Sequence, residues 1–445
     1  MSDTASNEKP KQLYQTWFDR FCLVTRREDP TTHSTWQKHA IVAITTLSAF
    51  TAPFASCILF PSFTTLVDYF HTTETKVALT TTVFLLGLAI APLWWSTLSQ
   101  HCGDCLRSRQ LATSYHRLPA HRSHGLLVSQ SVGAGVISDI YISTERGSAL
   151  GWFYLGTLIG PLVAPIIGGA LQVWLGWRAN LYFMAIFTFI SAMLTLLVLP
   201  ETLVKSSTEQ PKPWHQVLKR NALAPLPKLE FLMVPSIALT IVYVSICFAS
   251  LYCFNTTLPY AYAAAPYNFS AIEIGLCYIS NCLGYAIGSV VGGKLSDAKL
   301  RQYQITHDGA IRPIERIKTV WYGVGFIPAG LIIYGWLIEK KVFWIAPLVG
   351  AFLFGLGLML VTATVMPFLV DIKPGVGASV VADLNLVRNI LAAIGTVVSP
   401  IATASIGFGW WMSILALICS LAVGCIVIVV WREGAEQDSA DGIAV

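Results

Sequence analysis

The side chains best placed to do chemistry in this sequence are ionisable residues within or beside long apolar segments. Asp383 and Arg388, with Asn385 between them, lie at or just inside the apolar segment 384–406. A charge in lipid costs roughly 2.5–3.5 kcal/mol on insertion scales, so it usually faces a bundle interior or a cavity. The alternative is a snorkelling interfacial arginine, with Asp383 as an acid at a helix start. The sequence leaves both interpretations open.

A second group of charged residues flanks the ends of apolar segments. Asp139, Glu145 and Arg146 lie around a short connection between two such segments, and Asp297 ends the sequence Gly-Gly-Lys-Leu-Ser-Asp further along the chain. We predict that these four residues belong to a cytoplasmic latch that holds one conformation. The alternative is that they are solvated loop charges.

Residues typical of metal chemistry gather in one polar stretch. Cys102 and Cys105 form a Cys-x-x-Cys pair, and the nearby histidines are His101, His116, His121 and His124. Zinc needs ordered, deprotonated ligands. The composition of this polar stretch differs from that of the apolar segments around it, so we expect no metal. The sequence holds no Gly-Lys-Ser phosphate loop and no catalytic triad or carboxylate pair in a polar context. We therefore expect no cofactor, no ATP-driven pump and no enzyme.

The composition places these residues in a membrane protein. Hydrophobic residues make up 54% of the chain and charged residues only 12%, with a mean hydropathy of +0.61. A soluble domain carries roughly 25% charged residues. The net charge of +5 is spread between apolar segments, which indicates membrane orientation and excludes a nucleic-acid partner. Residues 1–39 show no signal peptide, so we expect the first span to direct insertion.

Apolar segments long enough to cross a bilayer organise the chain. Ten are clear, and 126–142 is a weaker eleventh; the ten are 41–60, 77–98, 148–171, 181–199, 231–254, 272–293, 319–338, 343–370, 384–406 and 410–430. Five precede and six follow a polar stretch that contains five basic residues. We expect a cytoplasmic tail (1–40), an N-terminal bundle (41–200), a cytoplasmic linker (201–230), a C-terminal six-helix bundle (231–431) and a second cytoplasmic tail (432–445).

The distribution of basic residues requires one more crossing than the apolar segments supply. With a cytoplasmic N-terminus and a hidden span between Gln100 and Leu126, the outside receives only Lys76, Arg178, Lys340 and Lys341. Without that span, everything after it inverts and the basic linker lies outside, against the positive-inside rule. The charges therefore favour twelve crossings, with both termini cytoplasmic.

The sequence does not provide the twelfth span. Residues 101–124 are far too polar to cross lipid. We interpret the segment 99–130 as aberrant, from a shifted reading frame or a misplaced splice junction that removed the third span. The alternative is a divergent loop with a deleted span.

Small residues at intervals of four predict close helix contacts. They form two runs, the first with Gly156, Gly160, Ala164 and Gly168, and the second with Gly284, Gly288 and Gly292. Such spacing lets helix backbones approach closely, either as static packing or as a sliding interface between two bundles. The segment 161–178 is echoed by 397–411, each with proline, small residues and Gly-Trp. The echo suggests a duplicated six-helix unit.

The most specific motif is Gly-Thr-Leu-Ile-Gly-Pro-Leu-Val-Ala-Pro-Ile-Ile-Gly-Gly at 156–169, which includes Gly156, Gly160, Pro161, Gly168 and Gly169. It resembles the antiporter motif of the fifth helix in drug:proton antiporters of the major facilitator superfamily. The segments 131–156, 199–203 and 385–389 resemble the twelve-span fungal branch. The resemblance covers nearly the whole chain. It implies an all-α polytopic fold of two six-helix bundles and proton-driven export of small molecules, typically across the plasma membrane.

Two departures bear on proton coupling. After the second span, the family has Gly-x-Leu-Ser-Asp-x-x-Gly-Arg-Arg; here Leu98 and Ser99 remain, but Gln100 replaces the aspartate. The segment 121–125 does not reproduce the family's Arg-x-x-Gln-Gly motif, whereas 292–297 keeps the second-half counterpart of the first motif.

The sequence therefore predicts a monomeric secondary transporter in the lipid bilayer. It would move protons and a small-molecule substrate by alternating access. Its substrate site would lie near mid-membrane between the halves, with Tyr154 and Asn281 as candidate contacts. The alternative is a transport-inactive relative that keeps the fold but lacks a span and proton coupling.

Overall fold

The structure is a computed structural model that describes residues 32–90, 133, 136–137, 140–141, 143–199, 232–307, 312–372 and 377–440. Within these ranges the regular elements are helices, and no strand occurs. Seven of the described helices are long and apolar enough to cross a membrane. The predicted all-α polytopic fold is thereby confirmed, because a bilayer forces each spanning segment to satisfy its backbone hydrogen bonds internally.

The first half contributes helices α1 (Thr35–Cys57), α2 (Phe63–Tyr69), α5 (Ser143–Leu175) and α6 (Trp177–Val198), with a short 3-10 turn, Phe60–Ser62, between the first two. A further helix covers residues 74–90. At the start of α1, the Ser34 hydroxyl accepts a hydrogen bond from the Gln37 backbone N–H, and the Gln37 side chain accepts one from the Ser34 N–H. This reciprocal cap fixes where the first span begins.

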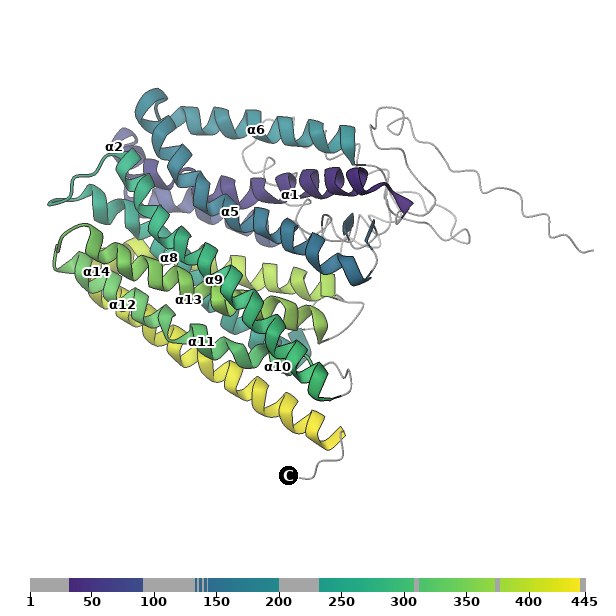
Figure 1. Ribbon diagram of the computed structural model, residues 1–445. Coiled ribbons are helices and arrows are strands. Elements are labelled where there is room, and N and C mark those ends of the chain that lie inside the picture. Colours follow the sequence, from purple (N-terminus) through teal and green to yellow (C-terminus); the bar gives the residue numbers. More distant parts are fainter. Residues whose placement is uncertain are drawn as a thin grey trace, which may run out of the picture.

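The second half contributes α8 (Pro235–Ala263), α9 (Ala271–Thr306), α10 (Ile314–Ile317), α11 (Trp321–Val324), α12 (Phe326–Glu339), α13 (Ile345–Asp371) and α14 (Gly377–Ala440). The helix α9 begins with a cap of the same kind, formed by Ser270 and Glu273. Gly407, with φ +84°, divides α14 into two helical parts. The described elements of the predicted C-terminal bundle thus supply six crossings, because α10 to α12 follow one another along a single path (Figure 1).

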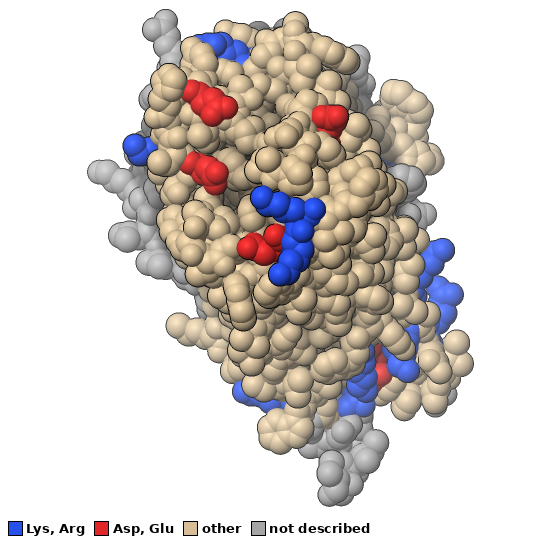
Figure 2. All heavy atoms as spheres, turned by 90° about the vertical axis from the view of Figure 1, so that its left-hand side faces the viewer, with Lys and Arg blue, Asp and Glu red and all other residues tan. Residues whose placement is uncertain are grey.

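The helices run side by side along one direction, with α1, α5 and α6 on one side and α8 to α14 on the other (Figure 1). The start of α1 and the end of α14 lie at the same end of the bundle. We name this the inner end and the opposite one, which holds Gly176 and the loop 264–270, the outer end, following the orientation predicted from the basic residues. Seen from the outer end, most of the surface carries no charged side chain, and basic side chains gather near its centre and at the lower right edge (Figure 2).

The sequence echo has a counterpart in the backbone. Gly176 has φ 81° and ψ 166° between α5 and α6, and Gly407 has φ 84° and ψ 167° between the two parts of α14. Residues with a Cβ rarely adopt this conformation. The turn between the fifth and sixth spans is therefore built the same way in both halves, which supports a duplicated unit.

The described part of the weak eleventh segment packs at the inner end. Val136, Ile137 and Ile140 are buried against Ile41 and Ala49 of α1. The proposed aberrant segment 99–130, the linker 201–230 and the terminal tail before residue 32 lie outside the described residues.

Candidate functional site: the interface between the two halves

The two halves meet most closely where α5 crosses α9 near the outer end. A Cβ at Gly275 would lie 2.6 Å from the Pro165 carbonyl oxygen. A Cβ at Gly169 would collide with the backbone carbonyl of Ala271. Each helix therefore needs a glycine where the other helix's backbone approaches.

Aromatic side chains close the same end of the interface. Phe60 stacks on Tyr278 of α9, with ring centres 6.3 Å apart, and packs edge-on against Tyr252 of α8. The Tyr252 hydroxyl lies 3.0 Å from the Ser56 hydroxyl of α1. Phe63 and Tyr260 add another ring contact between the halves. These side chains are buried, so the outer ends of the two halves are packed together in this conformation.

A second contact joins the helix at 74–90 to α14. The hydroxyls of Thr82 and Thr396 are 2.7 Å apart, and Thr82 also donates to the Ala393 carbonyl. Both threonines are buried. Buried hydroxyls bond to a partner because an unmade hydrogen bond there costs free energy, so this pair fixes the register of the two helices.

The glycines of the predicted antiporter motif face two different neighbours. A Cβ at Gly156 would collide with Thr46 of α1, one at Gly168 with Ile58 directly after α1, and one at Gly160 would lie 3.0 Å from the Phe54 nitrogen. Pro161 and Pro165 lie inside α5. Most of the motif therefore packs α5 against α1 within the first half, and Gly169 alone among its named glycines faces the second half.

The run Gly284, Gly288 and Gly292 behaves in the same way. A Cβ at each would meet backbone or side-chain atoms of α13, at Phe352, Leu356 and Leu360 respectively. The four-residue spacing therefore marks packing inside each half. The contact between the halves depends instead on Gly169 and Gly275.

At the inner end, Asp297 takes part in a three-residue ion-pair cluster. Arg316 lies 2.6 Å from Asp297 through Nη1 and 3.0 Å from Asp371 through Nε, and Nη1 also donates to the Ser296 hydroxyl. Burial raises the pKa of Asp371 more than Arg316 lowers it, and Asp297 raises it further. The cluster joins the inner part of α9, the short helix α10 and the end of α13.

The other predicted latch residues cannot be placed against this cluster. Asp139 lies outside the described residues, and Glu145 and Arg146 belong to α5 with their side chains outside the description. Their part in a latch stays a prediction.

The polar residues at the start of α14 face the protein interior. Asp383 is fully buried, and Asn385 and Asn389 are also buried. The Asn389 amide donates to the Asn385 carbonyl at 2.7 Å. The Arg388 guanidinium carbon lies 4.7 Å from the centre of the Phe248 ring of α8. Arg388 thus packs on a neighbouring helix, and the choice between the two sequence interpretations stays a prediction.

Of the two predicted substrate contacts, the structure describes the side chain of one. Asn281 is buried between α9 and α13, where its amide donates to the Tyr285 hydroxyl at 3.1 Å and its carbonyl side packs against Gly355. The side chain of Tyr154 lies outside the description, as do Cys102, Cys105 and the histidines near them. A substrate role for Asn281 and Tyr154 stays a prediction.

Comparison with known proteins settles the family. The Major Facilitator Superfamily pattern matches residues 125–396, more than half of the chain. The chain belongs to the major facilitator superfamily. Solved structures share the fold: a D-xylose-proton symporter has a TM-score of 0.63 at 12% identity, with 87% of this chain and 97% of that chain covered. An auto-inhibited POT family peptide transporter has a TM-score of 0.59 at 13% identity, with 89% and 97% covered.

Sequence relatives in this superfamily confirm the fungal antiporter branch. The MFS antiporter QDR3 of Candida albicans is 28% identical, covering 92% of this chain and 80% of the relative. Quinidine resistance protein 3 of Saccharomyces cerevisiae is 26% identical, covering 95% and 87%. The MFS transporter OpS2 of Beauveria bassiana is 32% identical over 70% of this chain and 95% of the relative. The protein is a membrane transporter of small molecules.

Sequence reasoning missed two residues of the inner cluster. Arg316 and Asp371 each lie beside an apolar segment, which resembles ordinary flanking charge. Their link to Asp297 depends on three elements separated by 19 and 55 positions. The segment 292–297 repeats the motif of the loop after the second helix, which indicates that Asp297 is important. The motif does not indicate which residues pair with Asp297.

Proposed function

We propose that this superfamily member exports small molecules in exchange for protons, by alternating access of a site between its two halves. The observation that carries the proposal is the α5–α9 crossing. Its packing depends on glycine at Gly169 and Gly275, so it presents smooth backbone surfaces that can separate without withdrawing interlocked side chains. The described conformation, closed at the outer end, is one of the two states that such a transporter needs.

Asp383 is our candidate for the proton carrier. It is a fully buried carboxyl group in α14, on the same helix as Thr396, which contacts the first half. Arg388, five residues further on, lies over the ring of Phe248. Intramembrane acids of this kind mark proton pathways, because their charge is costly unless function requires it. Protonation of Asp383 would bias one of the two states.

The substrate class is taken from the relatives and from the chemistry of the interface. Aromatic residues dominate the contacts between the halves at Phe60, Phe63, Tyr252 and Tyr278. Such surfaces bind flat apolar or cationic organic molecules. The printed names of relatives include an antiporter and a quinidine resistance protein. We therefore propose drug-like or metabolite-like organic molecules as substrates and the plasma membrane as the site of action.

The test is accumulation of a fluorescent organic cation in cells that lack their own efflux pumps. Cells that produce the chain should retain less dye than empty-vector cells, and a protonophore should abolish the difference. Asp383→Asn should abolish export while the protein still inserts, whereas Asp297→Asn, at a carboxylate that is 67% exposed, should reduce it less. Equal dye retention with and without a correctly inserted chain would contradict the proposal.

The alternative, a transport-inactive member, is favoured by the polar segment 99–130. The matches to the two yeast relatives run over 564 and 604 positions, more than the 445 residues of this chain, so those relatives carry residues that it lacks. Sequencing the transcript across codons 98–131 separates the two cases. About 20 additional apolar residues would support a complete antiporter, and an unchanged transcript would favour the inactive form.

A further inference from the structure

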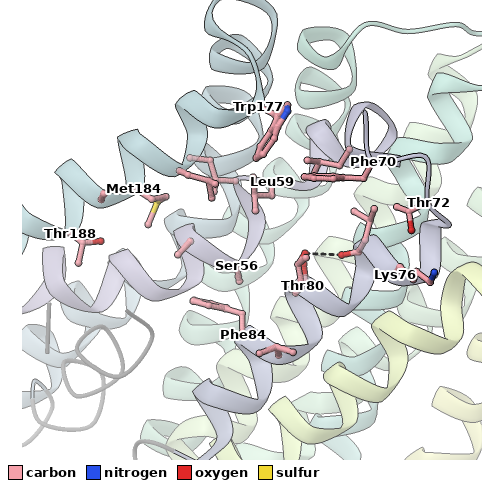
Figure 3. Close-up of a pocket in the computed structure, with 18 of the residues that line it drawn as sticks. Ser56, Leu59, Phe70, Thr72, Lys76, Thr80, Phe84, Trp177, Met184 and Thr188 are labelled. Atoms are coloured by element: carbon pink, nitrogen blue, oxygen red, sulfur yellow. Dashed lines mark hydrogen bonds between the residues drawn. The ribbon is translucent and has the colours of Figure 1, made fainter. Parts of the chain in front are cut away.

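A groove opens between the outer halves of α1 and α6. It has a volume of about 830 Å³ and is lined by Ser56 of α1, by Leu59 just after α1, by Phe84 of the helix at 74–90, and by Trp177, Met184 and Thr188 of α6, among others (Figure 3). The labelled side chains of α6 face those of α1 and the helix at 74–90 across it. The lining is mostly apolar, and a transport site between the two halves would lie elsewhere, because every lining residue belongs to the first half.

The second half shows what normally fills such a position. Counting from the matched turns at Gly176 and Gly407, Leu181 of α6 corresponds to Met412 of α14. Met412 is fully buried and lies against Gly335 of α12, the third span of its half. Leu181 lines the groove and is 42% exposed. The groove is therefore the position that a third span would occupy in the first half.

The helix α6 is correspondingly underpacked. Within the described residues, 11% of the residues in its most apolar 18-residue stretch are buried, whereas 33–67% are buried in the corresponding stretches of the other six candidate spans. Burying apolar surface is worth about 25 cal/mol per Å² relative to water, but in a bilayer the competing solvent is lipid, so hydrocarbon chains can replace a helix at little cost.

The length and charge of the groove indicate which lipid fits it. From Trp177 to Phe189 the lining follows α6 over twelve helical steps, or about 18 Å at 1.5 Å per step, roughly one leaflet of a 30 Å hydrocarbon core. Among the described residues that line it, Lys76 is the one charged residue, and it lies at the same end as Thr72 (Figure 3). Arg178 lies beside the rim, 4.5 Å from the ring of Trp177.

We propose that this groove binds an anionic phospholipid of the outer leaflet, with its acyl chains against α1 and α6 and its phosphate near Lys76 and Arg178. These are two of the four bases that the predicted topology places outside. A protein helix would need a groove that crosses both leaflets, whereas acyl chains need only one. The lipid thus fills the groove beside α6 and keeps α6 attached to the bundle.

The test uses the full chain in nanodiscs that carry a trace of phospholipid with a photoactivatable group on its acyl chain. Phosphatidylglycerol and phosphatidylcholine probes are compared, and adducts are mapped by peptide mass spectrometry. We expect adducts on groove residues such as Met184 and Thr188, about five-fold more with the anionic probe, since a lysine near the surface contributes about 1 kcal/mol. Lys76→Gln should remove most of this preference.

A filling variant and its neighbour complete the design. Ala185→Phe places a ring in the groove and should reduce groove adducts several-fold, while Ile186→Phe, at a residue that is 60% exposed and does not line the groove, should leave them unchanged. Adducts spread evenly over α6 for both headgroups would overturn the proposal, as would a chain-to-chain adduct at the groove, which would show a second copy there. If Ala185→Phe fails to fold, the headgroup preference of the wild-type chain and of Lys76→Gln still decides.

Discussion

The substitution Gly275→Ala should shift the transporter away from the conformation described here. The added methyl group would lie 2.6 Å from the Pro165 carbonyl oxygen and 3.3 Å from its carbon, against a best separation of about 3.5–4.0 Å between carbon atoms. Backbone atoms of two long helices cannot rotate aside, so α5 and α9 must separate or bend. Overpacking of this kind costs about 1–3 kcal/mol.

The cost falls on one conformation only. If the outer ends of the two halves part during transport, the methyl group is harmless in the open state, so the whole penalty shifts the equilibrium toward it. A shift of about 1–3 kcal/mol corresponds to roughly 5- to 150-fold. The matched control is Gly293→Ala on the same helix, because a Cβ at Gly293 has no heavy atom within 4 Å.

The assay is the rate at which a membrane-impermeant maleimide reacts with a cysteine introduced as Ser56→Cys. Ser56 is 4% exposed and contacts Tyr252, so the reaction reports opening of the outer end. We expect the rate to rise by about 5- to 150-fold with Gly275→Ala and to stay unchanged with Gly293→Ala. Equal rates in the two variants, with both proteins folded, would refute the reasoning that the α5–α9 crossing opens.

Three further predictions concern the ion-pair cluster at the inner end and the turn at Gly407 between the two parts of α14. The pKa of Asp371 is raised in the folded chain, so Asp371 binds a proton there at a higher pH than in the unfolded chain. Its contribution to stability therefore rises as the pH falls through the folded-state pKa. The melting temperature of Asp371→Asn should lack this pH dependence. Arg316→Lys should loosen the cluster, since one ammonium nitrogen cannot replace both Nη1, which hydrogen-bonds Asp297, and Nε, which forms the ion pair with Asp371. Slower transport with normal insertion is the expected result. Gly407→Ala should lower stability by about 1–3 kcal/mol because φ is +84° there and the Cβ would lie 2.9 Å from Glu339 Oε2. The control Gly424→Ala, with open space around the glycine, should leave the melting temperature unchanged.

Much of the fold followed from the sequence because hydropathy is a local property. A segment of about 20 apolar residues can cross a bilayer only as a helix, so the ten clear segments could be predicted without knowing their neighbours. Boundaries were less certain: α8 continues to Ala263, nine residues past the predicted end at Phe254. Polar residues in the extension, such as Asn255 and Thr256, hide its helical character, but they are buried against the rest of the bundle.

The sequence by itself determined the membrane class, the superfamily and the residues able to form close helix contacts. Only the tertiary structure decided which contacts they make. Spacing of four indicates a packing face, but whether that face meets α1 or α9 depends on helices more than a hundred residues away, as for Gly168 and Gly169. The same holds for the charges: Asp297 stands in a recognisable motif, yet its partner Arg316 and the burial of Asp371 result from three chain segments meeting at one end, which no local pattern encodes.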